Sequence, residues 1–251
     1  MKHGITLFLT LVSTALCVPS FAEMPRGNTT NESYVQAKKT LDRRVYFDHR
    51  VTLYCAATFD RHRTVKLPKG FKAPSDKKRA RRLEWEHVIP AQWFGREFDA
   101  WKYGSFECTD GAGRGRQCAE RVSREFRLMH ADMYNLFPAI GAVNRIRSNY
   151  PYTEFPEFIP ATFGSCPMKV YRKKAEPPAF ARGEISRAAL YMQWAYPERV
   201  KLSRKMSEMM TRWNETYPVS AWECLRSRRI EALQGNENPF VKEPCRRAKL
   251  W

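Results

Sequence analysis

The chain has 251 residues, 43% of them hydrophobic, which is long enough for one large domain or two small ones with a buried core. Size alone therefore does not force metals or disulfides on the fold. The formal net charge of +18 favours a polyanionic partner, namely nucleic acid, an anionic membrane surface or an acidic glycan, with simple solubility by like-charge repulsion as the alternative.

Residues 1–22 have the features of a cleavable secretory signal. Basic residues near the start precede the apolar run ITLFLTLVSTALCV, and the small-x-small sequence SFA follows at 20–22. The mature chain would then begin at Glu23. The alternative is a lipoprotein anchor on Cys17, but Leu16 precedes it where such signals favour a small residue.

Beyond the signal, no apolar run approaches the roughly 18 residues that are needed to span a bilayer. We therefore expect an exported protein, periplasmic or secreted, with no stable membrane insertion. The sequence implies no protein partner.

Removal of the signal leaves an even number of cysteines, which in an exported chain indicates up to three disulfides. The candidates are Cys55, Cys108, Cys118, Cys166, Cys224 and Cys245. The pairing stays open among about 15 arrangements, although Cys108 and Cys118 bracket a Gly-rich segment and suggest a local clip. A zinc site is disfavoured because there is no C-x-x-C and the histidines show no ligand spacing.

The N-terminal part alternates between helical and extended patterns. Residues 23–33 are polar and turn-rich and predict a flexible arm before a domain at 34–251, while apolar residues from Tyr34 to Val45 recur at helical spacing. The segment HRVTLYCAATF, residues 49–59, predicts a strand. The basic stretch at 66–82 predicts a solvated loop.

RLEWEHVIP predicts the next strand, which Pro90 would end because proline cannot donate to a central ladder. Residues 104–116 predict a Gly-rich loop, and Pro138 lies where a helix could begin. Two apolar stripes at helical spacing predict buried helix faces in the last third: Ile185, Ala188, Ala189 and Met192, then Leu202, Met206, Met209 and Trp213. The predicted class is α+β, a single mixed domain with a helix-rich C-terminal half.

Glu86 and His87 are neighbours in the predicted strand. A carboxylate is a hard oxygen ligand suited to Mg²⁺, whereas imidazole is a general base near neutral pH. Because an ideal strand points neighbours to opposite faces, the chain must bend for both to serve one site. A Glu-His pair alone is more often structural than catalytic, and Glu84, Trp85 and Trp93 are expected to pack and support.

Three motifs in fixed order favour a catalytic role for this pair. RLEWEHVIPAQWFG, a loop ending in GRGRQC, and DMYNLFPAIGAVNRIRSN together resemble the bacterial endonuclease I family of secreted, nonspecific nucleases. The likeness continues in VYFDHRVTLYC, EPPAFARGEISRAALYM, YPVSAWEC and QGNENPF, and covers residues 34–246. The resemblance implies a ββα-metal (His-Me finger) motif within the α+β domain.

The resemblance also implies roles for matching residues. His87 is then the general base, and Glu86 and Asn144 hold one Mg²⁺ ion, a metal that usually keeps several waters and few protein ligands. The family uses an arginine from the Gly-rich loop to stabilise the phosphate. The match leaves Arg114 and Arg116 open, with a slight preference for Arg116.

Further matches concern the surroundings of the site. Arg147 and Asn149 match family positions and are candidate phosphate contacts, while Asp132 and Asn135 match a D-M-x-N-L segment and are expected to support the site by bracing loop backbone. The family commonly has a YCGC-like pair where this chain has YCAA. Ala57 therefore replaces a cysteine, and at least one family bridge is expected to be missing.

The implied activity is Mg²⁺-dependent, sequence-nonspecific endonucleolytic hydrolysis of double- and single-stranded DNA, with RNA expected as well, leaving 5′-phosphate ends. The positive charge agrees with phosphate contacts that read no bases. Two alternatives stay open: a mainly RNA-directed nuclease of the same fold, and a catalytically inactive, basic nucleic-acid-binding protein of the envelope.

Overall fold

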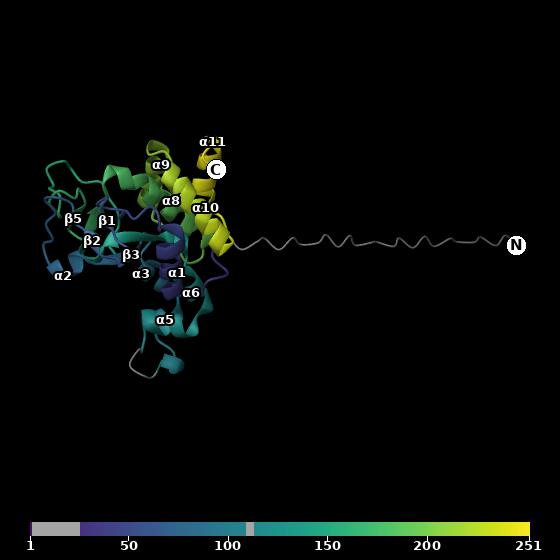
Figure 1. The fold of residues 1–251 in the computed structure, drawn as a ribbon. Helices are drawn as coiled ribbons and strands as arrows, with labels where there is room; N and C mark the ends of the chain where they lie inside the picture. The colour runs from purple at the N-terminus through teal and green to yellow at the C-terminus, as the bar shows by residue number, and fades with distance from the viewer. Residues whose placement is uncertain (2–25, 109–112) are drawn as a thin grey trace.

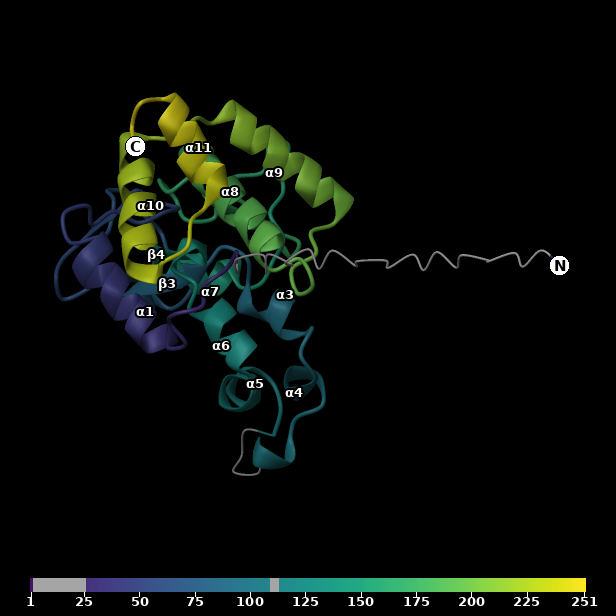
Figure 2. The same ribbon diagram turned by 90° about the vertical axis from the view of Figure 1, so that its right-hand side faces the viewer.

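The computed structural model describes residue 1 and residues 26–108 and 113–251. The predicted signal after Met1, residues 23–25 of the predicted arm, and part of the Gly-rich loop lie outside the described residues. Two antiparallel strands, β3 (Leu83–His87) and β4 (Leu136–Ile140), lie among the helices, and α7 (Gly141–Arg147) packs against both (Figures 1 and 2). Mixed helices and small antiparallel sheets confirm the α+β class.

The remaining elements surround this centre. The other helices are α1 (Tyr34–Thr40), α2 (Lys77–Ala80), α3 (Ala91–Gly95), α4 (Asp99–Lys102), α5 (Arg116–Val122), α6 (Arg124–His130), α8 (Ala179–Ala195), α9 (Arg204–Thr216), α10 (Ala221–Gln234) and α11 (Pro239–Arg247). Short turns are the π-type η1 (Leu41–Val45) and the 3-10 type η2 (Phe106–Cys108) and η3 (Met133–Asn135). Two further antiparallel ribbons pair β1 (Thr58–Phe59) with β2 (Val65–Lys66), and β5 (Lys169–Tyr171) with β6 (Lys174–Glu176).

Strand β3 confirms the strand predicted around EWEH. Glu86 lies opposite Phe137 of β4, and His87 lies opposite Leu136. The strand ends at His87, before Pro90, which instead occupies the position preceding α3. The two residues of interest therefore stand at the last two positions of a buried strand.

The helix start predicted at Pro138 is wrong, because Pro138 lies inside β4 and α7 begins only at Gly141. The carbonyl of Pro138 accepts a hydrogen bond from the Leu53 backbone N–H at 2.8 Å, so this residue points its backbone groups away from β3. The missing proline N–H therefore costs the β3–β4 ladder no hydrogen bond.

The single strand predicted over 49–59 is also wrong. Thr52 and Ala57 instead close a turn, in which the Thr52 N–H donates to the Ala57 carbonyl at 2.9 Å and Thr52 Oγ1 accepts from the Ala57 N–H at 3.0 Å. Ala56 takes a φ of +48° within it. Local side-chain capping thus outweighs the β-branched and aromatic composition that suggested a strand.

The basic stretch at 66–82 is mostly irregular, as predicted, apart from one turn of helix, α2. The helix-rich C-terminal third is confirmed, with α8 and α9 packed against each other. The predicted stripes are buried at Ile185, Ala188, Ala189, Met192, Met206, Met209 and Trp213. These residues form part of one continuous core with β3 and β4.

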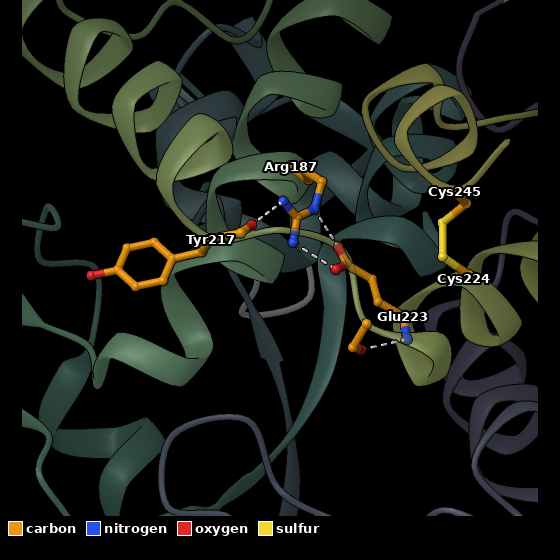
Figure 3. Close-up of a disulfide and its surroundings, with 6 residues drawn as sticks. Arg187, Tyr217, Glu223, Cys224 and Cys245 are labelled. Carbon is orange, nitrogen blue, oxygen red and sulfur yellow. Dashed lines mark hydrogen bonds and ion pairs between the residues drawn. A yellow bond between two sulfur atoms is a disulfide. The ribbon is translucent and has the colours of Figure 1, made fainter. Parts of the chain in front are cut away.

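An ion pair and a disulfide fix α10 in place (Figure 3). Arg187 of α8 donates from Nε and Nη2 to the two carboxylate oxygens of Glu223, at 2.6 Å each, and from Nη1 to the Tyr217 carbonyl at 2.8 Å. The next residue, Cys224, is bonded to Cys245 of α11. The ion pair is buried, and each of these three nitrogens of Arg187 has its own acceptor. The pair therefore fixes the orientation of α10 as well as its distance from α8.

All six cysteines predicted to pair are in disulfides. The local clip between Cys108 and Cys118 is confirmed. Sequence reasoning left the others open, and they pair as Cys55–Cys166 and Cys224–Cys245.

The flexible arm predicted for 23–33 is wrong over residues 26–33. Asn28 is buried, its backbone N–H donates to the Tyr196 hydroxyl at 2.8 Å, and its side chain donates to the Leu128 carbonyl at 2.8 Å. Thr30 donates its hydroxyl to the Gln234 carbonyl at 2.8 Å. The polar side chains of this segment therefore form hydrogen bonds with buried groups, and the segment is an ordered strap.

In the described residues, no helix has the length and apolar character required to cross a membrane.

Candidate active site

A pocket of about 590 Å³ opens beside the end of β3. Its walls come from α1, β3, α5 and α7 and from the start of α3. Six of the residues predicted for the site line it: Glu86, His87, Arg116, Asn144, Arg147 and Asn149. It also contains Tyr34, Lys38, Arg63, Arg79, Glu84 and Arg145. The fold thus gathers the predicted residues in one strongly cationic cavity.

Glu86 is only 2% exposed at the base of this pocket. Its Oε1 accepts a hydrogen bond from the Tyr54 hydroxyl at 2.8 Å and lies 2.9 Å from Nη1 of Arg147. Burial raises the pKa of Glu86 to about 7, although the Arg147 guanidinium and the Tyr54 hydroxyl oppose this rise. Both contacts fall on Oε1, which leaves Oε2 without a hydrogen-bond donor among the described residues.

His87 has a fixed tautomer. Its Nε2 lies 3.0 Å from the backbone carbonyl oxygen of His130. A carbonyl can only accept, so Nε2 carries the proton and Nδ1 keeps a lone pair. Burial lowers the pKa of His87 well below its usual value, and the neighbouring His130 lowers it further. The imidazole is therefore neutral near pH 7 and available as a base.

The ring of His87 packs against two aromatic side chains, those of His130 and Tyr34. It lies parallel to the ring of His130, with centroids 4.8 Å apart, and Tyr34 approaches both rings at 5.1 and 4.4 Å. His130 is itself fixed, because its Nδ1 lies 2.7 Å from Oε1 of Glu120 on α5. The orientation of His87 thus depends on α1, α5 and α6.

Asn144 reaches the pocket from α7. Its Nδ2 donates to Oε2 of Glu84 at 2.8 Å, and Glu84 accepts a second hydrogen bond on the same oxygen from Nη2 of Arg79 at 2.9 Å. An amide that donates from its nitrogen presents its oxygen elsewhere, so Oδ1 of Asn144 is the atom left for a ligand. Glu84 and Arg79 therefore orient Asn144.

Glycine at position 141 permits this arrangement. A Cβ added to Gly141 would lie 2.8 Å from Oε1 of Glu84 and 2.8 Å from the Arg79 carbonyl oxygen. The start of α7 can therefore approach β3 closely only without a side chain, and this close approach brings Asn144 to Glu84.

Arg147 is 1% exposed and already has several partners. Its Nη1 donates to the His87 carbonyl at 3.0 Å and its Nη2 to the Val88 carbonyl at 2.7 Å, in addition to the ion pair with Glu86. The guanidinium also lies 4.5 Å from the centre of the Tyr152 ring. These contacts make Arg147 a clamp on the end of β3 more than a group presented to a ligand.

Asn149 lies at the rim of the pocket. Its side-chain amide donates to Gln92, and its backbone carbonyl accepts from Nε1 of Trp93 at 3.0 Å. Trp93, expected to pack and support, therefore anchors the segment that follows α7.

The two arginines of the Gly-rich loop are separated in space. Arg116, the first residue of α5, is exposed and lines the pocket together with His87. Arg114 instead lines a neighbouring groove with Trp101 and Lys102. The geometry favours Arg116 as the arginine that can reach a phosphate held beside His87.

Asp132 and Asn135 are fully buried behind the pocket. Asn135 brackets Ile89, with Oδ1 accepting from its N–H at 2.8 Å and Nδ2 donating to its carbonyl at 2.9 Å. Asp132 accepts from the hydroxyls of Tyr191 and Tyr196 at 2.7 and 2.6 Å. Asn135 thereby holds the backbone that leaves β3 after His87. Asp132 joins the segment before β4 to Tyr191 of α8 and to Tyr196.

Sequence reasoning expected Glu84 to act as a supporting residue, and its hydrogen bond with Asn144 agrees with that role, but it missed the contact of Glu120 with His130. Glu84 lies two residues before Glu86, so strand periodicity alone would place both on one face. No comparable signal marks the contact between Glu120 and His130, because it joins two separate helices.

The donor set in the pocket suits a hard divalent cation. Oε2 of Glu86 and Oδ1 of Asn144 are oxygen atoms without hydrogen-bond donors among the described residues, and Mg²⁺ prefers few protein oxygens plus waters and phosphate. In residues 26–108 and 113–251, no group of three His, Cys, Asp or Glu side chains is arranged to hold a metal. A two-ligand site for Mg²⁺ does not require such a group.

The fold and the pocket define an α+β protein with a neutral, oriented imidazole set among buried carboxylates and arginines. The sequence profile of endonuclease I matches residues 28–245, and this chain belongs to the endonuclease I family.

Three relatives illustrate the similarity. An extracellular deoxyribonuclease of Aeromonas hydrophila is 39% identical over 222 residues, covering 85% of this chain and 91% of its own. A periplasmic deoxyribonuclease of the same organism is 37% identical, covering 80% and 82%. Endonuclease-1 of Buchnera aphidicola subsp. Acyrthosiphon pisum is 36% identical, covering 86% and 83%. The residues that line the pocket lie between positions 34 and 149, within the range 28–245 that the profile matches.

Proposed function

We propose that this protein is a Mg²⁺-dependent endonuclease that hydrolyses the phosphodiester bonds of DNA without sequence preference. One observation carries the proposal: neutral His87, with a free Nδ1, shares a cationic pocket with the oxygen donors of Glu86 and Asn144. Family membership and the names of its deoxyribonuclease relatives support DNA as the substrate.

The order β3, β4, α7 supports a ββα-metal motif as the frame of the site. The two strands are antiparallel, the first ends with Glu86 and His87, and the helix that follows the second supplies Asn144. Base and proposed ligands therefore come from elements that pack directly on one another.

In the proposed reaction, Nδ1 of His87 accepts a proton from the water that attacks phosphorus in line. The His130 carbonyl keeps the Nε2 proton in place, so the ring stays in the correct tautomer as it becomes charged. General-base catalysis of this kind contributes on the order of 10²- to 10⁴-fold. Cleavage of the bond to the 3′ oxygen would leave a 5′-phosphate and a 3′-hydroxyl.

Glu86 and Asn144 would hold Mg²⁺, which when bound would neutralise charge on the phosphate and on the departing 3′ oxygen. Arg116 would donate to the phosphate oxygens from the start of α5. Such contacts are directed at the backbone and read no bases, which accounts for cleavage without sequence preference and extends the proposed substrates to single strands and RNA.

The relatives named extracellular and periplasmic support the same destination for this chain, together with the signal predicted at 1–22. Three disulfides agree with folding in an oxidising compartment.

The test is cleavage of double- and single-stranded DNA and of RNA by the mature protein, with Mg²⁺ or with EDTA. We expect Mg²⁺-dependent cleavage that His87→Ala lowers by at least about 100-fold. His62→Ala is the matched control, because His62 is exposed outside the pocket. Equal cleavage by His87→Ala and the wild type would disprove the site.

The same assay separates the alternatives. Cleavage of RNA with little cleavage of DNA would identify the RNA-directed nuclease, and binding of DNA without cleavage by any variant would identify the inactive binding protein.

A further inference from the structure

A second hollow lies next to the pocket, on the side of the segment that carries the Cys108–Cys118 disulfide. We call this hollow the arm groove; it is distinct from the N-terminal segment at residues 23–33. Its lining consists of Gln92, Arg96, Trp101, Lys102 and Arg114. The lining thus contains three cations, an amide and an indole, and no carboxylate. Gln92 lines both hollows, so the arm groove continues from the pocket.

Close backbone contacts build the groove. A Cβ added to Gly95 would lie 2.4 Å from the Trp101 ring, so only glycine lets this indole lie against α3. Gly104 has a φ of +88°, and a Cβ there would lie 2.2 Å from the Gly113 carbonyl oxygen. Gly95 thus lets α3 approach Trp101 of α4, and Gly104 lets the segment after α4 approach the segment before α5. Arg114 is thereby held beside the helix that carries Lys102.

The three cations of the arm groove are available to a ligand. Arg96, Lys102 and Arg114 are exposed, and none has a side-chain ion pair within residues 26–108 and 113–251. Of the acids nearby in sequence, Glu97 lines a different hollow together with Arg199, and Asp99 is on α4 with Lys102 but does not line the groove. Within residues 26–108 and 113–251, the positive charge of the groove is therefore not neutralised by a direct ion pair.

We propose that the arm groove is a second phosphate-binding surface, which holds the nucleic-acid strand on one side of the bond cleaved in the pocket. The inference rests on the proposed function, because it takes the occupant of the pocket to be a phosphodiester. The chemistry fits a polyanionic strand: exposed guanidinium and ammonium groups contact phosphates whatever the base sequence. Because Gln92 lines both hollows, one strand can reach from the pocket into the groove.

This division of labour accounts for both arginines of the Gly-rich loop. Arg116 faces the phosphate that is cleaved, and Arg114 contacts a phosphate farther along the strand. The contribution of Arg114 is therefore to the affinity for long substrates.

The test measures binding of a fluorescent DNA duplex of about 30 base pairs in EDTA as a function of salt. The variant carries Arg96→Gln, Lys102→Gln and Arg114→Gln. The control carries Arg228→Gln in α10, Arg247→Gln at the end of α11 and Lys249→Gln after it. These changes remove the same charge from exposed sites. Helix α11 and the C-terminus lie at the end of the molecule away from α5 (Figures 1 and 2).

The slope of log affinity against log salt is negative. We expect it to become less steep by about 2.7 in the groove variant, because each lost phosphate contact removes about 0.9 from its magnitude. Between 50 and 200 mM salt, this difference corresponds to a roughly 40-fold change in the ratio of wild-type to variant affinity. The control variant should change the slope by less than about one contact. Equal slopes for the groove and control variants would overturn the proposal.

Binding in EDTA requires no catalysis, so failure of the two proposals can be distinguished. A groove variant with a reduced slope supports the arm groove even if the wild type cleaves nothing. A wild type that cleaves DNA, paired with a groove variant that binds like the control, overturns the groove and leaves the proposed function intact. Circular dichroism must show that both variants are folded, which the exposure of all six side chains leads us to expect.

Discussion

Arg147 offers the sharpest test of how the site is held together. Arg147→Met removes one partner of a buried ion pair and leaves Glu86 without its compensating charge. Removing one partner of such a pair costs about 3–5 kcal/mol in unfolding free energy. The change also leaves the carbonyls of His87 and Val88 without donors, each of which costs about 1–3 kcal/mol when buried. Because these effects overlap, we expect a total loss of about 4–6 kcal/mol.

The assay is urea unfolding of the protein in EDTA, with Arg145→Met as the matched control on the same helix. Arg145 pairs with Asp76 at an exposed site, so its replacement should cost less than about 1 kcal/mol. Adding Glu86→Gln to Arg147→Met should restore part of the loss, because no charge then remains buried. If Arg147 were mainly a phosphate contact, Arg147→Met would keep its stability and lose affinity for DNA, which would refute our assignment.

Three further predictions concern the same pocket. Burial raises the pKa of Glu86 to about 7, so its carboxyl contributes most to stability below the unfolded pKa of 4.5, and this contribution is lost as pH rises through 7. The free energy of unfolding in EDTA should therefore fall between pH 4.5 and 7. Glu86→Gln should flatten this dependence of stability on pH. Glu84→Ala should weaken Mg²⁺ binding by about 10- to 100-fold in calorimetry, because the amide of Asn144 loses its acceptor; unchanged affinity would contradict that role. Replacing Cys108 and Cys118 by Ser should lower cleavage by up to about 100-fold, because the disulfide holds the start of α5; full cleavage by the folded variant would contradict this.

Short contiguous motifs explain what the sequence could predict. Glu86 and His87 are adjacent, and Asn144 lies within a recognisable GAVNR segment, so the family resemblance selected residues that the fold then brings into one pocket. The apolar stripe of α8 was predictable for a similar reason, because helical periodicity records which face is buried.

Contacts between distant segments explain what the sequence could not predict. Cys55 and Cys166 are 111 positions apart, and nothing local couples them. Arg147 looks like a surface residue of a basic helix, yet its guanidinium is buried because β3 ends beside it. The turn between Thr52 and Ala57 is local, but its side-chain hydrogen bonds compete with a composition that favours strands.

The polar strap at residues 26–33 has a consequence for the order of folding. Asn28 contacts Tyr196, 168 positions later, and Thr30 contacts Gln234, 204 positions later, so the strap binds to segments that are synthesised long after it. Gln234 also donates to Asp132, in the segment that leads into β4. A chain made from its N-terminus cannot close this network until α10 is complete. The support behind the pocket is therefore finished late, and a partly synthesised chain carries Glu86 and His87 without the framework that would align them.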